Sequence, residues 1–275
     1  MTSLTSRSVA TIAATALLLT ACSVAGGVGD TAPAATQNGA GGAAQLQARP
    51  KLSADIEAMP RLVGDSAAVR AINAELERSD ATTGRNAAEC AADADDSPGG
   101  GWTRWITQPM TGPAYVTLRE HLDVYCGGAY PSTQQTAVTY DLQTGRRVDW
   151  VAALPGLGLS FSTFEEMPPD HVPLVSSAAL GAWYSRKMLA NPDAEWVDQC
   201  RGVFDPDQLA EQTFNIWADA ENGGVTVAPD FAHVAQACAD SATLTFADLR
   251  RLNADPSLVA AIAAAHAARN WVPKP

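Results

Sequence analysis

Residues 115–125 have the sequence YVTLREHLDVY, the clearest strand pattern in the chain. The alternate apolar positions of this stretch are Val116, Leu118, Leu122 and Val124. Because successive side chains of a strand point to opposite faces, the alternation predicts one apolar and one polar face. Glu120 interrupts the apolar face at its centre. We therefore expect a strand over all eleven residues, with one acidic side chain on its apolar face.

The segments downstream of this strand predict antiparallel hairpins. Cys126-Gly127-Gly128 ends the strand, and residues 136–142 then alternate again between apolar and polar side chains. Further along, Asn222-Gly223 separates two apolar runs, residues 214–218 and 225–228. This dipeptide is the strongest short hairpin signal, because both of its residues tolerate positive φ.

Helices are expected between and after these hairpins. Asp65 is a candidate cap for a helix on which Val69, Ile72 and Leu76 share one face. Further helices are expected around Leu180, Tyr184 and Met188, and after Asp205-Pro206, Thr245 and Asp255-Pro256. The elements lack the regular strand–helix rhythm of a parallel sheet. We predict an α+β domain over residues 51–275, with a mostly antiparallel sheet packed with helices.

The N-terminus has the layout of a bacterial export signal. Arg7 precedes an apolar run over residues 9–19, which is too short to span a bilayer. The run ends in Leu19-Thr20-Ala21-Cys22, which resembles the lipobox of bacterial lipoproteins. We predict a signal peptide over residues 1–21 and a lipidated Cys22, with palmitate among its acyl chains. An ordinary export signal that contains a cysteine is the alternative.

Residues 22–50 are expected to form the lipidated cysteine and a flexible tether. Half of residues 23–50 are Ala or Gly, and the segment has no helical or strand periodicity. As a flexible chain it would have a root-mean-square span of roughly 30 Å. The predicted location is the extracytoplasmic side of a membrane, at the outer membrane or periplasmic face in a two-membrane bacterium.

The remaining four cysteines predict disulfides. An even number of cysteines in an exported chain favours bridges, and four cysteines allow three connectivities. We favour Cys90–Cys126 and Cys200–Cys238, because each pair falls in its own half of the domain and flanks predicted strands. A metal site is the alternative, but the chain has no Cys-x-x-Cys and no closely spaced histidines.

The charge balance excludes one class of partner. The chain has 30 acidic and 18 basic residues, for a formal net charge of −12. Nucleic-acid binders carry a basic footprint, so we expect no nucleic-acid partner. A basic protein remains compatible with this acidity.

Two short motifs resemble those of an uncharacterised extracytoplasmic domain. They are Gly-Gly-Ala-Tyr-Pro at residues 127–131 and Asp-Leu-Gln-Thr-Gly at residues 141–145. The usual form of that domain has a Gly-Gly-Ala-His-Pro loop between two strands, the second closing on Asp-Leu-x-Thr-Gly. The domain forms the outer part of the lysozyme-sensing anti-sigma factor RsiV and accompanies a peptidoglycan deacetylase domain. The resemblance covers about residues 55–255.

One residue departs from this pattern, because Tyr130 stands where the family usually has His. The role of that histidine is therefore not carried over. We also identify neither a separate deacetylase domain nor a cytoplasmic sigma-binding segment. The resemblance accordingly implies a binding or sensing domain, without deacetylase activity or sigma control.

Two groups of residues are candidates for binding. The loop with Gly127, Gly128, Tyr130 and Pro131 is a candidate binding loop, and Trp102 with Trp105 is a candidate aromatic patch. Loops on a rigid sheet and exposed aromatic side chains are common recognition elements. A purely structural loop and two core tryptophans are the alternatives.

No catalytic motif is evident. The nearest approach to Gly-x-Ser-x-Gly, at residues 158–162, lacks the second glycine. The histidines, His121, His171, His233 and His266, are far apart in the sequence. We assign no catalytic residue, no metal and no cofactor.

The sequence thus predicts a lipid-anchored envelope protein with a non-enzymatic binding or sensing domain. Its expected partners are the membrane, through the lipid on Cys22, and a basic extracytoplasmic protein such as lysozyme. A cell-wall hydrolase or deacetylase-like enzyme and a purely structural envelope lipoprotein are the alternatives.

Overall fold

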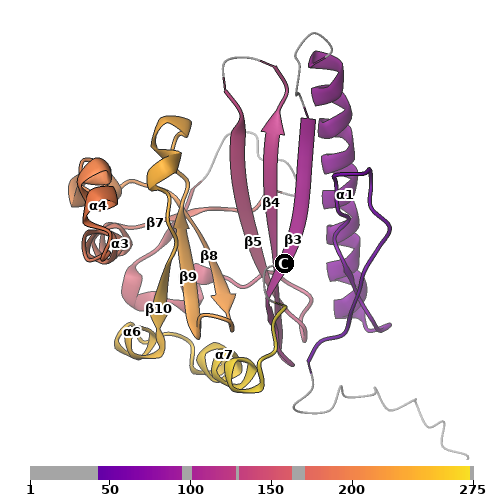
Figure 1. Cartoon of the computed structure of the whole chain (residues 1–275). Coiled ribbons are helices and arrows are strands. Elements are labelled where there is room, and N and C mark those ends of the chain that lie inside the picture. Colours follow the sequence, from indigo (N-terminus) through magenta and orange to yellow (C-terminus); the bar gives the residue numbers. More distant parts are fainter. Residues whose placement is uncertain (1–42, 95–100, 128–129, 163–170, 273–275) are drawn as a thin grey trace, which may run out of the picture. The chain divides into compact units, whose positions relative to one another are not determined.

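A three-stranded sheet contains β3 (Gly101–Thr111), β4 (Tyr115–Tyr125) and β5 (Ser132–Asp141), with β4 in the middle (Figure 1). Both pairings are antiparallel. The strand predicted over residues 115–125 is confirmed with the same bounds. The computed structural model describes residues 43–94, 101–127, 130–162 and 171–272. The predicted signal peptide, Cys22 and Gly128 lie outside this range.

One face of this sheet packs against a long helix, α1 (Ala67–Asp93). Ile72 and Leu76 of α1 pack against Val116 and Leu118 of β4 in one apolar cluster. The helix cap is Ser66, whose hydroxyl accepts the N–H of Val69, so the expected cap at Asp65 is one residue early. A cap accepts from the second or third helical amide, and the spacing from Ser66 satisfies that rule.

Glu120, on the apolar face of β4, is accommodated by a buried arginine. The Glu120 Oε1 lies 2.5 Å from Nε of Arg104, whose side chain is fully buried. Arg104 also donates to Asp80 of α1 at 2.9 Å, and Asp80 accepts from Arg61 at 2.7 Å. Buried charges are retained where they are paired and hydrogen-bonded. The acidic residue therefore belongs to an ion network between helix and sheet.

A second sheet has the order β10-β9-β8-β7-β6 and is also antiparallel. Its strands are β6 (Ser160–Phe161), β7 (Val175–Ser176), β8 (Phe214–Asp219), β9 (Gly224–Pro229) and β10 (Ala242–Thr245). The hairpin predicted at Asn222-Gly223 joins β8 and β9, and Gly223 has φ +66°. This hairpin prediction is confirmed.

The remaining elements are short or cover the second sheet. Two short strands are β1 (Leu46–Gln47) and β2 (Arg61–Leu62). The helices are α2 (Trp150–Ala153), α3 (Ala178–Leu189), α4 (Ala194–Cys200), α5 (Pro206–Leu209), α6 (Phe246–Arg251) and α7 (Pro256–Ala268). Two 3-10 turns are η1 (Pro155–Leu157) and η2 (His233–Cys238). An α+β fold with antiparallel sheets is thus confirmed.

The start of the folded part differs from the expected boundary at residue 51. Leu46 of β1 pairs with Leu62 of β2, and the N–H of Ala44 donates to the carbonyl of Thr111 at 2.8 Å. A two-residue strand is too short to produce a periodic sequence pattern. The fold therefore includes the last residues of the segment that we expected to be tether.

The two sheets meet where β8 packs against the three-stranded sheet. Ala218 of β8 donates its N–H to the hydroxyl of Thr139 at 3.0 Å and accepts from the hydroxyl of Thr117 at 2.8 Å. Asn215 makes a similar pair of bonds with the backbone of Ala137. Buried backbone groups need such partners. At this contact, side chains of each sheet thus form hydrogen bonds with backbone groups of the other.

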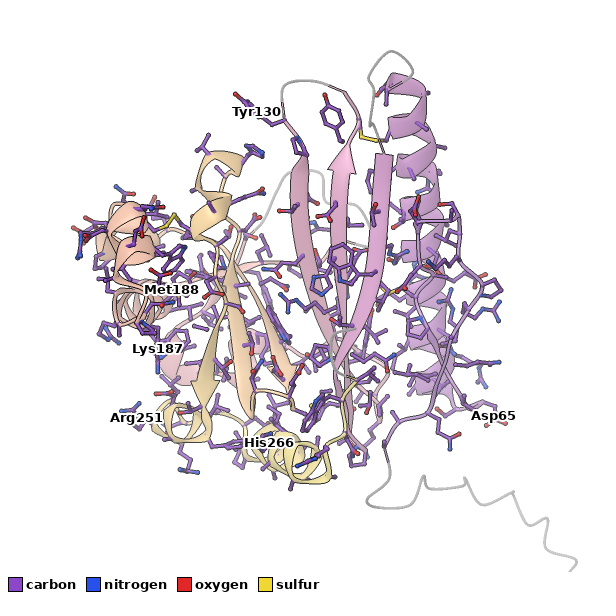
Figure 2. All side chains as sticks on the ribbon, in the orientation of Figure 1. Asp65, Tyr130, Lys187, Met188, Arg251 and His266 are labelled. Atoms are coloured by element: carbon purple, nitrogen blue, oxygen red, sulfur yellow. A yellow bond between two sulfur atoms is a disulfide. The ribbon has the colours of Figure 1, made fainter. Side chains whose placement is uncertain are left out.

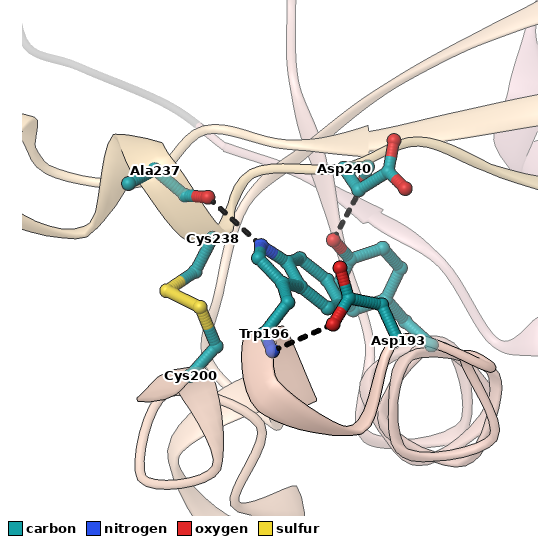
Figure 3. The surroundings of a disulfide bond; sticks show 7 residues. Asp193, Trp196, Cys200, Ala237, Cys238 and Asp240 are labelled. Atoms are coloured by element: carbon teal, nitrogen blue, oxygen red, sulfur yellow. Dashed lines mark hydrogen bonds between the residues drawn. A yellow bond between two sulfur atoms is a disulfide. The ribbon is translucent and has the colours of Figure 1, made fainter. Parts of the chain in front are cut away.

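Both expected disulfides are present, Cys90–Cys126 and Cys200–Cys238. The first joins α1 to the end of β4, and the second joins α4 to η2. Beside the second bridge, Trp196 donates its indole N–H to the carbonyl of Ala237 at 3.1 Å (Figure 3). Disulfides are typical of chains that fold in an oxidising, extracytoplasmic compartment. Among the described helices, none is both long and apolar enough to cross a membrane.

Candidate functional site

A cleft of about 670 Å³ lies between the three-stranded sheet and the β9–η2 segment. We call it the inter-sheet cleft; its principal polar and aromatic lining residues are Trp105, His121, Asp123, His171, Asp230 and His233. They come from β3, β4, β9–η2 and the segment before β7. Asn215, which bonds the backbone of Ala137, bounds this space on one side.

The floor of the cleft has a fixed pair of rings. Trp105 of β3 lies opposite His121 of β4 in the sheet register, and their rings stack at 4.9 Å with an angle of 5° between the planes. The Nε2 of His121 lies 3.1 Å from the hydroxyl of Thr107. Because His121 is buried, this stack and hydrogen bond hold both rings in place. The floor therefore offers a preorganised aromatic surface.

The opposite wall contains Asp230, which follows β9. Desolvation of its carboxyl group by the surrounding protein raises the pKa of Asp230, although the residue is exposed on the whole, and the nearby His171 lowers it in part. The carbonyl of His171 accepts from Arg147 at 2.5 Å, and Arg147 is paired with Glu75 of α1 at 2.6 Å. The position of His171 is thus tied to the helix on the far side of the sheet.

The rim of the cleft is formed by the candidate binding loop and η2. His233 of η2 lies 2.8 Å, through Nε2, from the carbonyl of Pro131, and its ring stacks on Tyr130 at 5.6 Å. Gln236 donates to the carbonyl of Thr133 at 3.0 Å. Tyr130 is nevertheless 74% exposed, and Figure 2 shows it at the end of the molecule opposite His266.

Both disulfides support this rim. Cys126 directly precedes the candidate binding loop, and Cys238 is the last residue of η2. Gly127 has φ +86°, a backbone conformation that glycine adopts without strain. The two sides of the rim are therefore each held by a covalent bridge next to them.

The two tryptophans of the candidate aromatic patch lie on opposite faces of the sheet. Trp102 is opposite Val124 and lies over α1, whereas Trp105 is opposite His121 and faces the cleft. Residues three apart in a strand point to opposite faces. Trp105 therefore shares the cleft side with the Tyr130 rim, and Trp102 packs between the sheet and the helix.

The convergence of three histidines cannot be seen in the sequence. His121, His171 and His233 lie far apart along the chain, yet all three line the inter-sheet cleft. No local motif marks them, because the register of β4, the approach to β7 and the start of η2 bring them together. Within the described residues, no three His, Cys, Asp or Glu side chains are grouped closely enough to bind a metal ion.

A second cavity of about 670 Å³ lies on the other side of Asn215. It is lined by the loop that contains the Asp-Leu-Gln-Thr-Gly motif, including Asp141, Thr144 and Arg146, and by Trp150. Gly145 in this loop has φ +72°, and a Cβ there would lie 2.7 Å from the backbone of Ala68. The glycine of the motif thus lets the loop pack against the start of α1.

Known proteins supply no further assignment. No family model matches the sequence, and no curated protein matches it. The structure thus defines an α+β, disulfide-bonded domain with a polar and aromatic cleft, and the resemblance to the extracytoplasmic domain family stays a prediction.

Proposed function

We propose that this chain is a lipid-anchored envelope protein whose folded domain binds or senses a basic extracytoplasmic protein, such as a lysozyme. The observation that carries the proposal is the rim of the inter-sheet cleft. There the exposed Tyr130 ring stands beside a cleft lined by Asp123 and Asp230, both exposed. An aromatic face and two carboxylates are suited to a Lys or Arg side chain of a partner.

Preorganisation supports this use of the rim. Ordering a loop on binding costs free energy, and a loop that is already held avoids part of that cost. The stack of Tyr130 on His233, the bond from Gln236 to Thr133 and the two disulfides hold the rim before any partner arrives. The net charge of −12 would also accelerate encounter with a cationic protein.

A retention experiment tests the proposal. Residues 38–275 form one unit that contains both disulfides, and this unit is immobilised while a basic lysozyme is passed over it. We expect retention at about 50 mM salt and weaker retention at about 300 mM salt, because salt screens exposed charges. Tyr130→Ala, and separately Asp123→Asn with Asp230→Asn, should each weaken binding about tenfold.

Matched controls separate the rim from general acidity. Val63→Ala removes an apolar side chain that is 52% exposed just after β2, outside the cleft lining, and Asp198→Asn removes a surface carboxylate of α4. Neither should change retention more than about twofold. Lack of retention at both salt concentrations would exclude lysozyme as the partner, and equal losses in rim and control variants would exclude the rim.

A second candidate function is a cell-wall hydrolase or deacetylase-like activity. The observation that favours it is the presence of three histidines and Asp230, whose pKa is raised, in one cleft. Such groups are those that general acid–base catalysis uses. Purified cell wall is incubated with the protein, and released sugars, peptides and acetate are measured. Release that His171→Gln abolishes would support this candidate, and no release would reject it.

A further inference from the structure

The outer surface of α6 and α7 has an apolar groove of about 590 Å³. Helix α7 turns Leu258, Ile262 and Ala265 toward the core, where they are buried. The groove is lined by Phe246, Arg250, Asn253, Ala254, Pro256, Val259, Ala260 and Ala263. Only Arg250 among these carries a charge, so the groove is an apolar surface with one basic residue at its edge.

The described chain begins beside the end of α7. The N–H of Ala44 donates to the carbonyl of Thr111 at 2.8 Å, and the N–H of Thr111 donates to the carbonyl of Asn270 at 2.7 Å. Asn270 lies two residues after the end of α7, and Ala263 of the groove lies five residues before that end, or about 8 Å along the helix axis. Any segment that leads from Cys22 to the folded unit therefore enters it near the groove.

A short tether from a lipid on Cys22 would keep this face close to the membrane. The inference rests here on the proposed lipidation of Cys22. The tether that the sequence predicts has a root-mean-square span of roughly 30 Å. A protein surface that is tethered near its lipid anchor meets the membrane at a high effective concentration.

Basic residues lie at the ends of the two helices that form the groove, although the chain as a whole is acidic. Arg250, Arg251 and Arg269 are exposed at the ends of α6 and α7. The acidic residues of the same elements are Asp248, which is paired with Arg251, and Asp255, which caps α7. Exposed arginines next to an apolar surface match the headgroups and the upper acyl region of an anionic bilayer.

We propose that the α6–α7 face rests on the surface of an anionic phospholipid bilayer. Figure 2 shows Arg251 and His266 at one end of the molecule and Tyr130 at the opposite end. This orientation holds the rim of the inter-sheet cleft away from the lipid, where a protein outside the membrane reaches it. The membrane thus sets the direction in which the binding surface faces.

Vesicle flotation with residues 38–275, which form one unit and lack Cys22, tests the proposal without any lipid anchor. The probes are vesicles of phosphatidylglycerol with phosphatidylcholine, and vesicles of phosphatidylcholine alone. We expect association with the anionic vesicles that is at least fivefold stronger than with the neutral ones and that decreases with added salt. Arg250→Glu and Ala260→Glu should each reduce the association by about fivefold or more.

One Arg-to-Glu and one Ala-to-Glu substitution on α1 serve as controls. Arg85→Glu and Ala81→Glu alter exposed residues of a helix away from the groove and should leave association within about twofold. Equal losses from both pairs of variants, or no association with anionic vesicles, would overturn the proposal. Lysozyme retention is measured without vesicles, so failure of the proposed partner and failure of the membrane face give different results.

Discussion

The side-chain amide of Asn215 pairs with the backbone of Ala137 as a neighbouring strand would, accepting from its N–H at 2.8 Å and donating to its carbonyl at 3.1 Å. Both residues are buried, and these bonds join β8 of the second sheet to β5 of the first. Asn215 also lines both large cavities. Together with the bonds of Ala218, this contact joins the sheets, and it lies between the inter-sheet cleft and the cavity behind it.

Replacing Asn215 tests the joint between the sheets. Asn215→Ala leaves the N–H and the carbonyl of Ala137 buried without these partners, so the free energy of unfolding should fall by about 2–4 kcal/mol. Asn215→Asp keeps an acceptor for the N–H but places a carboxylate oxygen opposite the carbonyl, so it should not restore stability. Urea denaturation followed by tryptophan fluorescence measures both. The exposed Asn86 provides the control, since Asn86→Ala should change stability by less than about 0.5 kcal/mol.

The disulfides give a prediction for the exported protein. Mass spectrometry under non-reducing conditions should find Cys90 linked to Cys126 and Cys200 linked to Cys238. In the chain-entropy model, loops of this length make each bridge worth about 3–4 kcal/mol. Replacing both cysteines of either pair by serine should therefore lower the free energy of unfolding by that order. Free thiols at these positions would contradict the pairing.

Local patterns in the sequence were enough for several elements. The alternation over residues 115–125 predicted β4 with its bounds, and Asn222-Gly223 predicted the β8–β9 hairpin. The capping sequence at Thr245 predicted α6, and the separate position of each cysteine pair favoured the observed bridges. Each of these signals is read within a few residues or from simple spacing, so it does not depend on tertiary contacts.

The inter-sheet cleft could not be predicted in the same way. Its histidines come from separate elements, and no local pattern in the sequence shows which face of one sheet packs against the other sheet. Trp102 and Trp105 form a pair in the sequence, but a strand divides them between two faces. β3 itself, over residues 101–111, was not expected, because Gln108 and Pro109 disturb its alternation and the register shifts between Thr107 and Met110.

The buried ion network between α1 and the sheet predicts that Asp80 contributes more to the free energy of unfolding than the exposed Asp198 does. Asp80→Asn removes the charge that faces the fully buried Arg104, and it should lower the free energy of unfolding by about 3–5 kcal/mol. Asp198→Asn breaks an exposed ion pair with Arg201 on α4 and should cost less than about 1 kcal/mol. Parallel urea titrations compare the two. Equal costs would show that burial does not decide the strength of these pairs.

Thr245 and Asp248 form a capping box at the start of α6. This box predicts that the stability of the protein depends on pH. Burial alone would raise the pKa of Asp248, but hydrogen bonds from Thr245 and Arg251 outweigh it, and the pKa lies below its ordinary value. A carboxyl group whose pKa is lowered by folding stabilises the fold above its unfolded pKa, near 3.9, and loses that contribution as the pH falls through its folded pKa. The excess stability of the wild type over Asp248→Asn should therefore be greatest near pH 6.

The same excess should shrink as the pH is lowered toward 3, and urea titrations at a series of pH values measure it. Thr245→Ala removes one of the hydrogen bonds that lower the pKa of Asp248 and also removes the hydroxyl cap, which accepts the Asp248 N–H at 3.3 Å. It should cost about 1 kcal/mol near neutral pH and move the acid loss of stability to higher pH. Only a group that titrates differently in the folded and unfolded chains makes stability depend on pH. If the excess stability of the wild type over Asp248→Asn stayed constant from pH 6 to pH 3, the charge of Asp248 would contribute nothing to stability.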